Sequence, residues 1–236
     1  MADKRSASRY AVIFDVDGTL IDSVDFHARA WVDAFAAFGH SVAFDKVRRQ
    51  IGKGGDQLMP VFLSHEEIER TGSALESHRG ALLKERYLPQ FRVFPKVREL
   101  VQRVLSDGTE VALGSSAKED ELAEYKKIAG IDDLIDTETS SDDAERSKPC
   151  PDIFEAAIRK LGIADLSSIL VVGDTPYDAQ AAQKAGLRTI GLRCGGWSEE
   201  ELRDAGCITV FDDPADLLAR YETSPLARPS RPFTHA

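Results

Sequence analysis

The sequence predicts an α/β protein, a parallel sheet covered by helices on both faces, with a smaller helical domain inserted into it. Two observations predict this fold. Short apolar runs alternate with helical patterns along most of the 236-residue chain, which is typical of parallel sheets whose crossover connections are helices. Residues 22–90 break the alternation, because they contain helical patterns and no convincing strand.

Four short apolar runs are predicted to be buried strands of the sheet. They are residues 10–14, 110–113, 169–172 and 189–192. In open α/β sheets, ligands bind beyond the carboxyl ends of the strands. The residues that follow each run are therefore the first candidates for a functional site.

The insertion carries two recognisable helix signals. Apolar residues recur at helical spacing before Gly39, a typical C-terminal stop: Phe26, Ala30, Ala34 and Phe38. Ser64 and Glu67 form a capping-box pattern that starts a second helix, which Pro89 ends. We expect a core of residues 1–21 and 91–222, a helical domain of residues 22–90, and a loose tail of residues 223–236, which holds three prolines.

Composition excludes several classes of protein. The formal net charge of -10 argues against a nucleic-acid surface, which needs clustered Lys and Arg. No apolar run approaches the ~20 residues of a membrane helix, and the N-terminus lacks a signal-peptide pattern. Three cysteines at unrelated spacings indicate free thiols. We expect a cytoplasmic protein, a monomer or weak dimer, with no membrane partner.

Asp15 and Asp17 follow the first predicted strand. Residues i and i+2 of an extended chain point the same way, so both carboxylates can face one site above the sheet. A divalent cation would relieve their repulsion, and oxygen ligands suit magnesium. One carboxylate could attack a substrate while the other moves a proton. The alternative is a pair of acidic turn residues, which are common at strand ends.

The ends of the later strands add polar residues. Ser115 and Ser116 precede a predicted helix, where each could be its N-cap or could hold phosphate oxygens. Lys148, flanked by prolines, is predicted to lie just before a helix and to point away from it. Asp174 lies at the end of the strand predicted at residues 169–172, much as Asp15 lies at the end of the first strand, and could complete a metal site. Asp178 has two interpretations of equal weight, a metal ligand or the partner of Thr175 in a helix cap.

These residues resemble the four motifs of the haloacid dehalogenase superfamily, which appear in order over residues 10–192. They are Asp-x-Asp-Gly-Thr-Leu from Asp15, a strand-end serine at Ser115, a lysine before proline at Lys148, and Gly-Asp-x-x-x-Asp from Gly173. The resemblance implies a Rossmann-like core and a helical cap that closes over the site. The members most similar in the cap are phosphoglycolate phosphatases and β-phosphoglucomutase.

The resemblance also implies roles for the residues. Asp15 would form an aspartyl-phosphate, and Asp17 would act as general acid and then as base. Mg²⁺ would be held by Asp15, the backbone carbonyl of Asp17 and Asp174, with Asp178 as a further candidate. Ser115 and Lys148 would hold the transferring phosphoryl group, assisted by Ser116. Dehalogenation ranks low, because the members that cleave carbon–halogen bonds differ at the second acidic position.

The expected reaction is Mg²⁺-dependent hydrolysis of a small phosphorylated metabolite, either phosphoglycolate-like or a sugar phosphate. Gly52, Lys53 and Gly54 are candidates for substrate binding, because glycines allow a close approach and the lysine could meet an anion. The alternative for this segment is a solvated turn. A phosphomutase shares the same core, but a glycine stands where the mutase places its phosphate-binding arginine. A non-catalytic module that binds a phosphorylated ligand is a third alternative.

Overall fold

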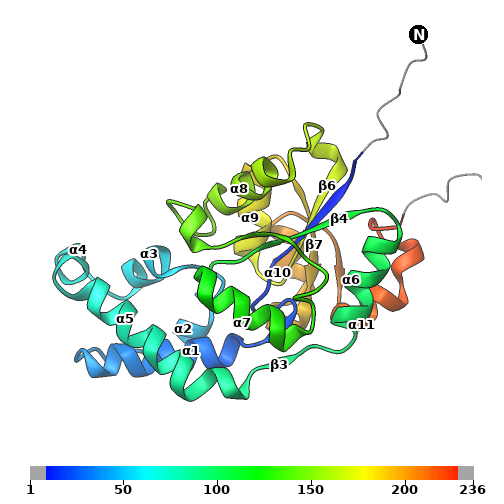
Figure 1. Ribbon diagram of the computed structural model, residues 1–236. Coiled ribbons are helices and arrows are strands. Elements are labelled where there is room, and N and C mark those ends of the chain that lie inside the picture. Colours follow the sequence, from blue (N-terminus) through cyan, green and yellow to red (C-terminus); the bar gives the residue numbers. More distant parts are fainter. Residues whose placement is uncertain (1–8, 228–236) are drawn as a thin grey trace, which may run out of the picture.

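The computed structural model describes residues 9–227, and its core is a six-stranded parallel sheet in the order β5-β4-β1-β6-β7-β8 (Figure 1). The strands are β1 (Ala11–Phe14), β4 (Glu110–Gly114), β5 (Thr137–Thr139), β6 (Ile169–Gly173), β7 (Arg188–Leu192) and β8 (Cys207–Phe211). The four predicted strands are confirmed, and the outer strands β5 and β8 were not predicted. Phe14 is in register with Leu113 on one side and Val172 on the other. The carboxyl ends of β4, β1 and β6 therefore meet at one edge.

Helices bury both faces of this sheet, which explains why its strands are continuous apolar runs. Val12 and Phe14 lie in the apolar cluster on one face, and Ala11 and Ile13 lie in the cluster on the other. The first face is covered by α6 (Val97–Ser106), α7 (Glu119–Ala129) and α11 (Pro214–Ala219). The second is covered by α8 (Asp152–Leu161) and α9 (Pro176–Lys184), and α10 (Glu199–Asp204) packs beyond α9.

The insertion between β1 and the rest of the sheet is helical, as predicted, and lies to one side of the sheet (Figure 1). Its helices are α1 (Val24–Ala37), α2 (Phe44–Arg48), α3 (Gly55–Leu58), α4 (His65–Glu67) and α5 (Ser73–Leu82), followed by short turns up to Gln90. An apolar cluster of its own includes Trp31, Phe35 and Leu75. The capping box of Ser64 and Glu67 is present at the start of α4.

Two short strands connect the insertion to the core. β2 (Ile21–Asp22) pairs antiparallel with β3 (Arg92–Val93), so both crossings between the two parts run side by side. Asp22 was expected to begin the helical part, and it lies instead in this ribbon. The division at residues 22 and 90 into two domains stays a prediction.

The chain beyond α11 differs from the predicted loose tail as far as the structure describes it. Ser224 and Leu226 are buried, and Leu226 belongs to the apolar cluster beneath α6 and α11. Hydrogen bonds also hold this segment, because Ser224 Oγ donates to the carbonyl oxygen of Tyr221 at 2.7 Å and accepts from the backbone N–H of Leu226 at 3.2 Å. Residues 228–236 lie outside the described residues. The three cysteines are free thiols, and none of the helices described here has the length and apolarity to cross a bilayer.

Candidate active site

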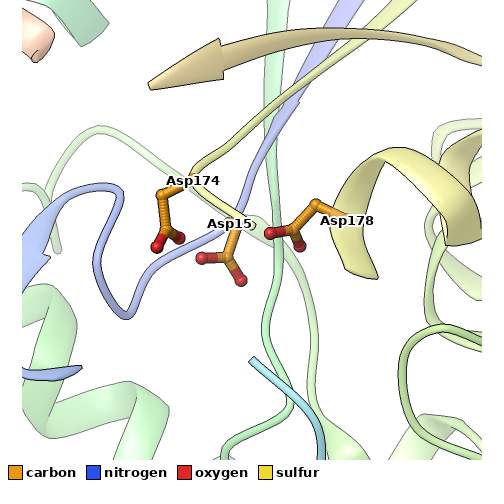
Figure 2. A group of neighbouring side chains, drawn as sticks. All are labelled: Asp15, Asp174 and Asp178. Carbon is orange, nitrogen blue, oxygen red and sulfur yellow. The ribbon is translucent and has the colours of Figure 1, made fainter. Parts of the chain in front are cut away.

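Three buried carboxylates meet at the carboxyl edge of the sheet (Figure 2). Asp15 follows β1, Asp174 follows β6, and Asp178 lies in the first turn of α9. Ligand oxygens of the three lie within 4.8 Å of one another. The sequence placed these residues at the ends of two strands and at the start of one helix, and the fold brings them together.

Lys148 is the cation of this cluster. Its side chain is fully buried, and Nζ lies 2.5 Å from Asp15 Oδ1 and 2.7 Å from Asp178 Oδ1. Nζ also donates to the carbonyl oxygen of Gly114, at 2.9 Å. Burial opposes the charged form, but Asp15 and Asp178 outweigh it and raise the pKa of Lys148. Lys148 is therefore a fixed positive charge beside the expected nucleophile, as its position before α8 predicted.

One lysine does not balance three carboxylates. Burial, with Asp178 and Asp17 nearby, raises the pKa of Asp15 to about 7 despite the opposing effect of Lys148. Burial and the charges of Asp15 and Asp178 also raise the pKa of Asp174. Asp174 Oδ2 is buried without a hydrogen-bond partner in the described part of the chain. An acceptor left unpaired in an acidic cluster fits a divalent cation, and the all-oxygen donor set fits Mg²⁺.

Glycine is required beside Asp174. A Cβ atom on Gly195 would lie 1.6 Å from Asp174 Oδ2, and one on Gly18 would lie 2.4 Å from the same oxygen. Both distances are far below contact range, and Gly18 also has a φ of +84°. The backbone of two loops thus packs closely against this carboxylate oxygen, and a side chain at either position would clash with it.

Thr19 completes the cluster, and the sequence analysis did not single it out. Its buried hydroxyl lies 3.0 Å from Asp15 Oδ2 and 3.0 Å from Asp174 Oδ1. A hydroxyl has one proton, so it can donate to only one of the two at a time. Thr19 lies inside the first motif, four residues after Asp15, and this position could have identified it as a site residue.

Asp17 is held apart from the three-carboxylate cluster. Ser23 Oγ donates to Asp17 Oδ1 at 2.6 Å, and His27 Nε2 lies 2.8 Å from the same oxygen. Burial favours the neutral acid, but His27, Ser23 and Lys148 together lower the pKa of Asp17. The side chain lines the cavity described below. His27, on α1, thus has a polar contact with a predicted catalytic group.

Ser115 and Ser116 do not cap α7, whose N-cap is Lys118. Ser115 is buried at the end of β4, and its Oγ accepts a hydrogen bond from the backbone N–H of Ala117 at 3.1 Å. Ser116 Oγ donates weakly to the carbonyl oxygen of Gly52, at 3.4 Å. Both serines line the cavity. The capping interpretation is wrong for them, and the phosphate-binding role stays a prediction.

The capping interpretation of Asp178 is confirmed for one of its oxygens, and the metal-ligand interpretation stays a prediction for the other. Oδ2 accepts from the backbone N–H and the hydroxyl of Thr175, at 3.0 and 2.6 Å, in a capping box with Pro176 in the first turn. Oδ1 faces Lys148. The cap therefore orients a carboxylate whose other oxygen belongs to the acidic cluster.

A cavity of about 210 Å³ opens above this cluster, between the core and the helical insertion. The insertion contributes the segment from Gly52 to Asp56, together with Trp31, Glu76 and Arg79. Lys53 lines the cavity, but its Nζ donates to Gln50 Oε1 at 2.6 Å and lies 4.5 Å from the ring centre of Tyr177. The backbone N–H of Gly54 donates to Ser147 Oγ at 2.8 Å. The predicted glycine segment therefore does reach the site, and it also docks on the core.

A buried lysine and buried aspartates at the carboxyl edge of a parallel sheet, beneath a cavity, form a polar site at the place where such sheets bind ligands. The chain belongs to the haloacid dehalogenase-like hydrolase family, whose model matches residues 12–192. The fold class and the family predicted from the sequence are both confirmed.

Three similar proteins illustrate the family. Protein SUPPRESSOR OF QUENCHING 1, chloroplastic, of Arabidopsis thaliana is 34% identical over 211 residues, which are 88% of this chain but only 20% of that protein. The phosphoglycolate phosphatase of Mannheimia succiniciproducens is 29% identical over 214 residues, or 87% of this chain and 95% of that one. The crystal structure of a hydrolase from Pseudomonas syringae has 30% identity and a TM-score of 0.80, and covers 91% of this chain and 99% of that chain.

Proposed function

We propose that this protein is a Mg²⁺-dependent phosphatase that hydrolyses a small phosphorylated metabolite through an aspartyl-phosphate on Asp15. The observation that carries the proposal is the buried contact of Lys148 with Asp15 at the carboxyl edge of the sheet, 2.5 Å long, inside a cluster of three carboxylates. A lysine in this position can neutralise phosphoryl oxygens, which is the main catalytic contribution in phosphoryl transfer. The names of relatives such as the phosphoglycolate phosphatase agree with it.

The first step transfers the phosphoryl group to the protein. A carboxylate oxygen of Asp15 forms a bond to phosphorus while the bond from phosphorus to the leaving oxygen breaks. The negative charge of the bound phosphoryl group raises the pKa of Asp17, which takes up a proton and gives it to that oxygen, so the product leaves as an alcohol. Ser115 and Lys148 hold the phosphoryl oxygens, and Ser116 assists them.

The second step hydrolyses the aspartyl-phosphate. Asp17, now a carboxylate, takes a proton from a water molecule whose oxygen attacks phosphorus. The bond to Asp15 breaks, and inorganic phosphate is released. Asp17 thereby regains the proton that it gave to the leaving group.

Asp15, Asp174 and the backbone carbonyl of Asp17 would hold the metal ion, with Asp178 contributing from its place beside Lys148. The ion supplies positive charge against the phosphoryl oxygens and against the repulsion among the carboxylates. The helical insertion would act as a cap that shuts out bulk water, and Gly52 to Gly54 would contact the leaving group. We place the reaction in the cytoplasm.

A panel of phosphorylated metabolites, assayed with and without Mg²⁺, tests the proposal. We expect release of inorganic phosphate that depends on Mg²⁺ and includes a generic aryl phosphate. Release from every substrate in excess chelator would refute the metal assignment. A phosphomutase would instead return an isomeric sugar phosphate with little free phosphate, so the same assay separates the two reactions.

A further inference from the structure

Arg79 is an unpaired cation in the wall of the cavity. It lies on α5 of the insertion, 5.2 Å from the ring centre of Trp31, and lines the cavity with it. Its Nε is buried and has no hydrogen-bond partner, and no ion pair holds its guanidinium within residues 9–227. A guanidinium is always charged and carries five N–H donors, and the buried Nε of this half-buried side chain lacks an acceptor.

Lys53, the other cation that the insertion brings to the cavity, is already engaged. Gln50 accepts from it, the ring of Tyr177 faces it, and burial lowers the pKa of its ammonium group. Arg79 therefore has more donors available for a ligand than Lys53. Its planar fork suits a carboxylate or a phosphate, which can accept two parallel hydrogen bonds.

Glu121 is the matching unpaired anion on the core side. It lies on α7, is 5% exposed, and lines the cavity. No hydrogen bond or ion pair to its side chain occurs in the described chain, although a buried carboxylate needs donors. Arg79 and Glu121 do not form an ion pair with each other, so neither satisfies the other.

The charges of Arg79 and Glu121 both affect the pKa of the buried Tyr125 hydroxyl. Burial raises the pKa of Tyr125, Asp17 and Glu121 raise it further, and Arg79 lowers it. Geometry also places the two residues near each other, because a Cβ atom on Gly80, the neighbour of Arg79, would lie 4.0 Å from Glu121 Oε1, and both side chains line the cavity. Asp17, which would protonate the leaving oxygen, belongs to the same neighbourhood.

We propose that Arg79 and Glu121 form a leaving-group subsite, in which Arg79 binds an anionic group and Glu121 accepts hydrogen bonds from a hydroxyl or ammonium beside it. The matching substrate is the phosphate ester of a small carboxylic acid that keeps a second hydroxyl or an amino group. Phosphoglycolate would satisfy Arg79 alone, because it has a carboxylate and no such donor. This inference rests on the proposed phosphatase activity and specifies its substrate class.

Four phosphoesters separate the two contacts when kcat/KM is measured with Mg²⁺. 3-Phosphoglycerate has both a carboxylate and a hydroxyl, and phosphoglycolate has only the carboxylate. Glycerol 3-phosphate has only hydroxyls, and an aryl phosphate has neither group. Arg79→Gln should lower kcat/KM about tenfold to a hundredfold for the two carboxylated esters only. Glu121→Gln should lower it for the two esters that carry hydroxyls.

Exposed residues of the same helical segments provide matched controls. Arg70→Gln and Glu119→Gln make the same chemical changes outside the cavity and should leave all four values unchanged. Thermal melting shows whether each variant is folded. If Arg79→Gln does not fold, Arg79→Lys replaces it, because lysine keeps the positive charge but lacks the planar pair of donors. It should retain part of the preference for carboxylated esters.

Equal losses on all four substrates, or no loss on any, would overturn the subsite. If wild type hydrolyses the aryl phosphate but neither variant changes the preference among the four esters, the proposed phosphatase activity stands and the subsite is refuted. If wild type releases phosphate from none of the four, the proposed function fails and the subsite fails with it.

Discussion

Single residues around Asp15 determine whether it can act as a nucleophile. Lys148 holds one of its oxygens and Thr19 lies against the other, which fixes the carboxylate at the floor of the cavity. The raised pKa of Asp15, about 7, means that a neutral, unreactive form competes at physiological pH when only Lys148 balances the cluster. Added positive charge from a metal ion would favour the carboxylate.

Asp15→Asn should fold and lose phosphatase activity by about a thousandfold or more, because an amide is a poor nucleophile toward phosphorus. The substitution preserves shape and removes one charge from an excess of buried carboxylates. Turnover and the melting temperature should be measured on the same preparation. Turnover close to wild type by the folded variant would refute the aspartyl-phosphate mechanism.

His27 is predicted to position Asp17 and to tune its proton affinity. Because His27 lowers the pKa of Asp17, His27→Ala should raise that pKa and move the corresponding limb of the kcat profile to higher pH. We expect kcat to fall by about tenfold, since one hydrogen bond to a charged group is lost.

His27→Gln, which restores a donor of similar reach, should recover part of both effects. His65→Ala is the matched control, because His65 is on the surface of the insertion, with 88% of its side chain exposed. A fall in kcat without any shift of the pH profile would mean that His27 serves packing alone.

At the scale of elements, the helical insertion is docked on the core through one loop and its neighbours. Arg49 forms an ion pair with Glu201 and lies 3.5 Å from the ring centre of Trp197. The hydroxyl of Tyr177 donates to the backbone carbonyl of Arg49 at 2.7 Å. These contacts join the segment that precedes Gly52 to α9 and α10, so they favour the enclosed form of the cavity.

Arg49→Ala should therefore lower kcat/KM for every phosphoester by a similar factor. An exposed ion pair contributes about 0–1 kcal/mol and a cation–π contact about 0.5–2 kcal/mol, which together correspond to a loss of roughly threefold to a hundredfold. Kinetics on the four esters used for Arg79 provide the measurement. A loss confined to carboxylated esters would contradict a role in closure.

At the scale of the whole molecule, the acidic cluster links folding to metal and to pH. In the absence of metal, the raised pKa of Asp15 means that the folded protein keeps a proton that the unfolded chain releases above about pH 4. That contribution to the free energy of unfolding is full at low pH and is lost as the pH rises through about 7. Asp174 acts in the same direction.

Mg²⁺ should consequently raise the melting temperature at pH 7.5, and should do so less at pH 5.5, where protons compete for the same carboxylates. At a concentration 100 times Kd the gain is about 2.7 kcal/mol, or roughly 5–11 °C for a chain of this size. Thermal melts with Mg²⁺ and with chelator measure it. Asp174→Asn is the control, and an equal shift in that variant would refute the metal site.

The local patterns of the sequence predicted the site better than they predicted its surroundings. The four motifs lie at the ends of β1, β4 and β6 and before α8 and α9, because strand ends and helix starts follow from apolar runs, glycine and proline. Since parallel strands meet at one edge, position along the chain was enough to group Asp15 and Asp174, whereas Lys148 was joined to them by the resemblance to the family's motifs. The strand β5 was missed because its three residues are polar, and β8 was missed because Thr209 interrupts its apolar run.

The fold class, the family and the residues of the acidic cluster could all be predicted from the sequence. Their partners could not: the structure shows that His27 contacts Asp17, that Thr19 lies between two carboxylates, and that Arg79 lines a cavity together with Glu121. Periodicity and caps are local, so they can be read from neighbours in the chain. A side chain's partners depend on how the insertion packs on the core, which brings together residues such as Gly54 and Ser147, 93 positions apart.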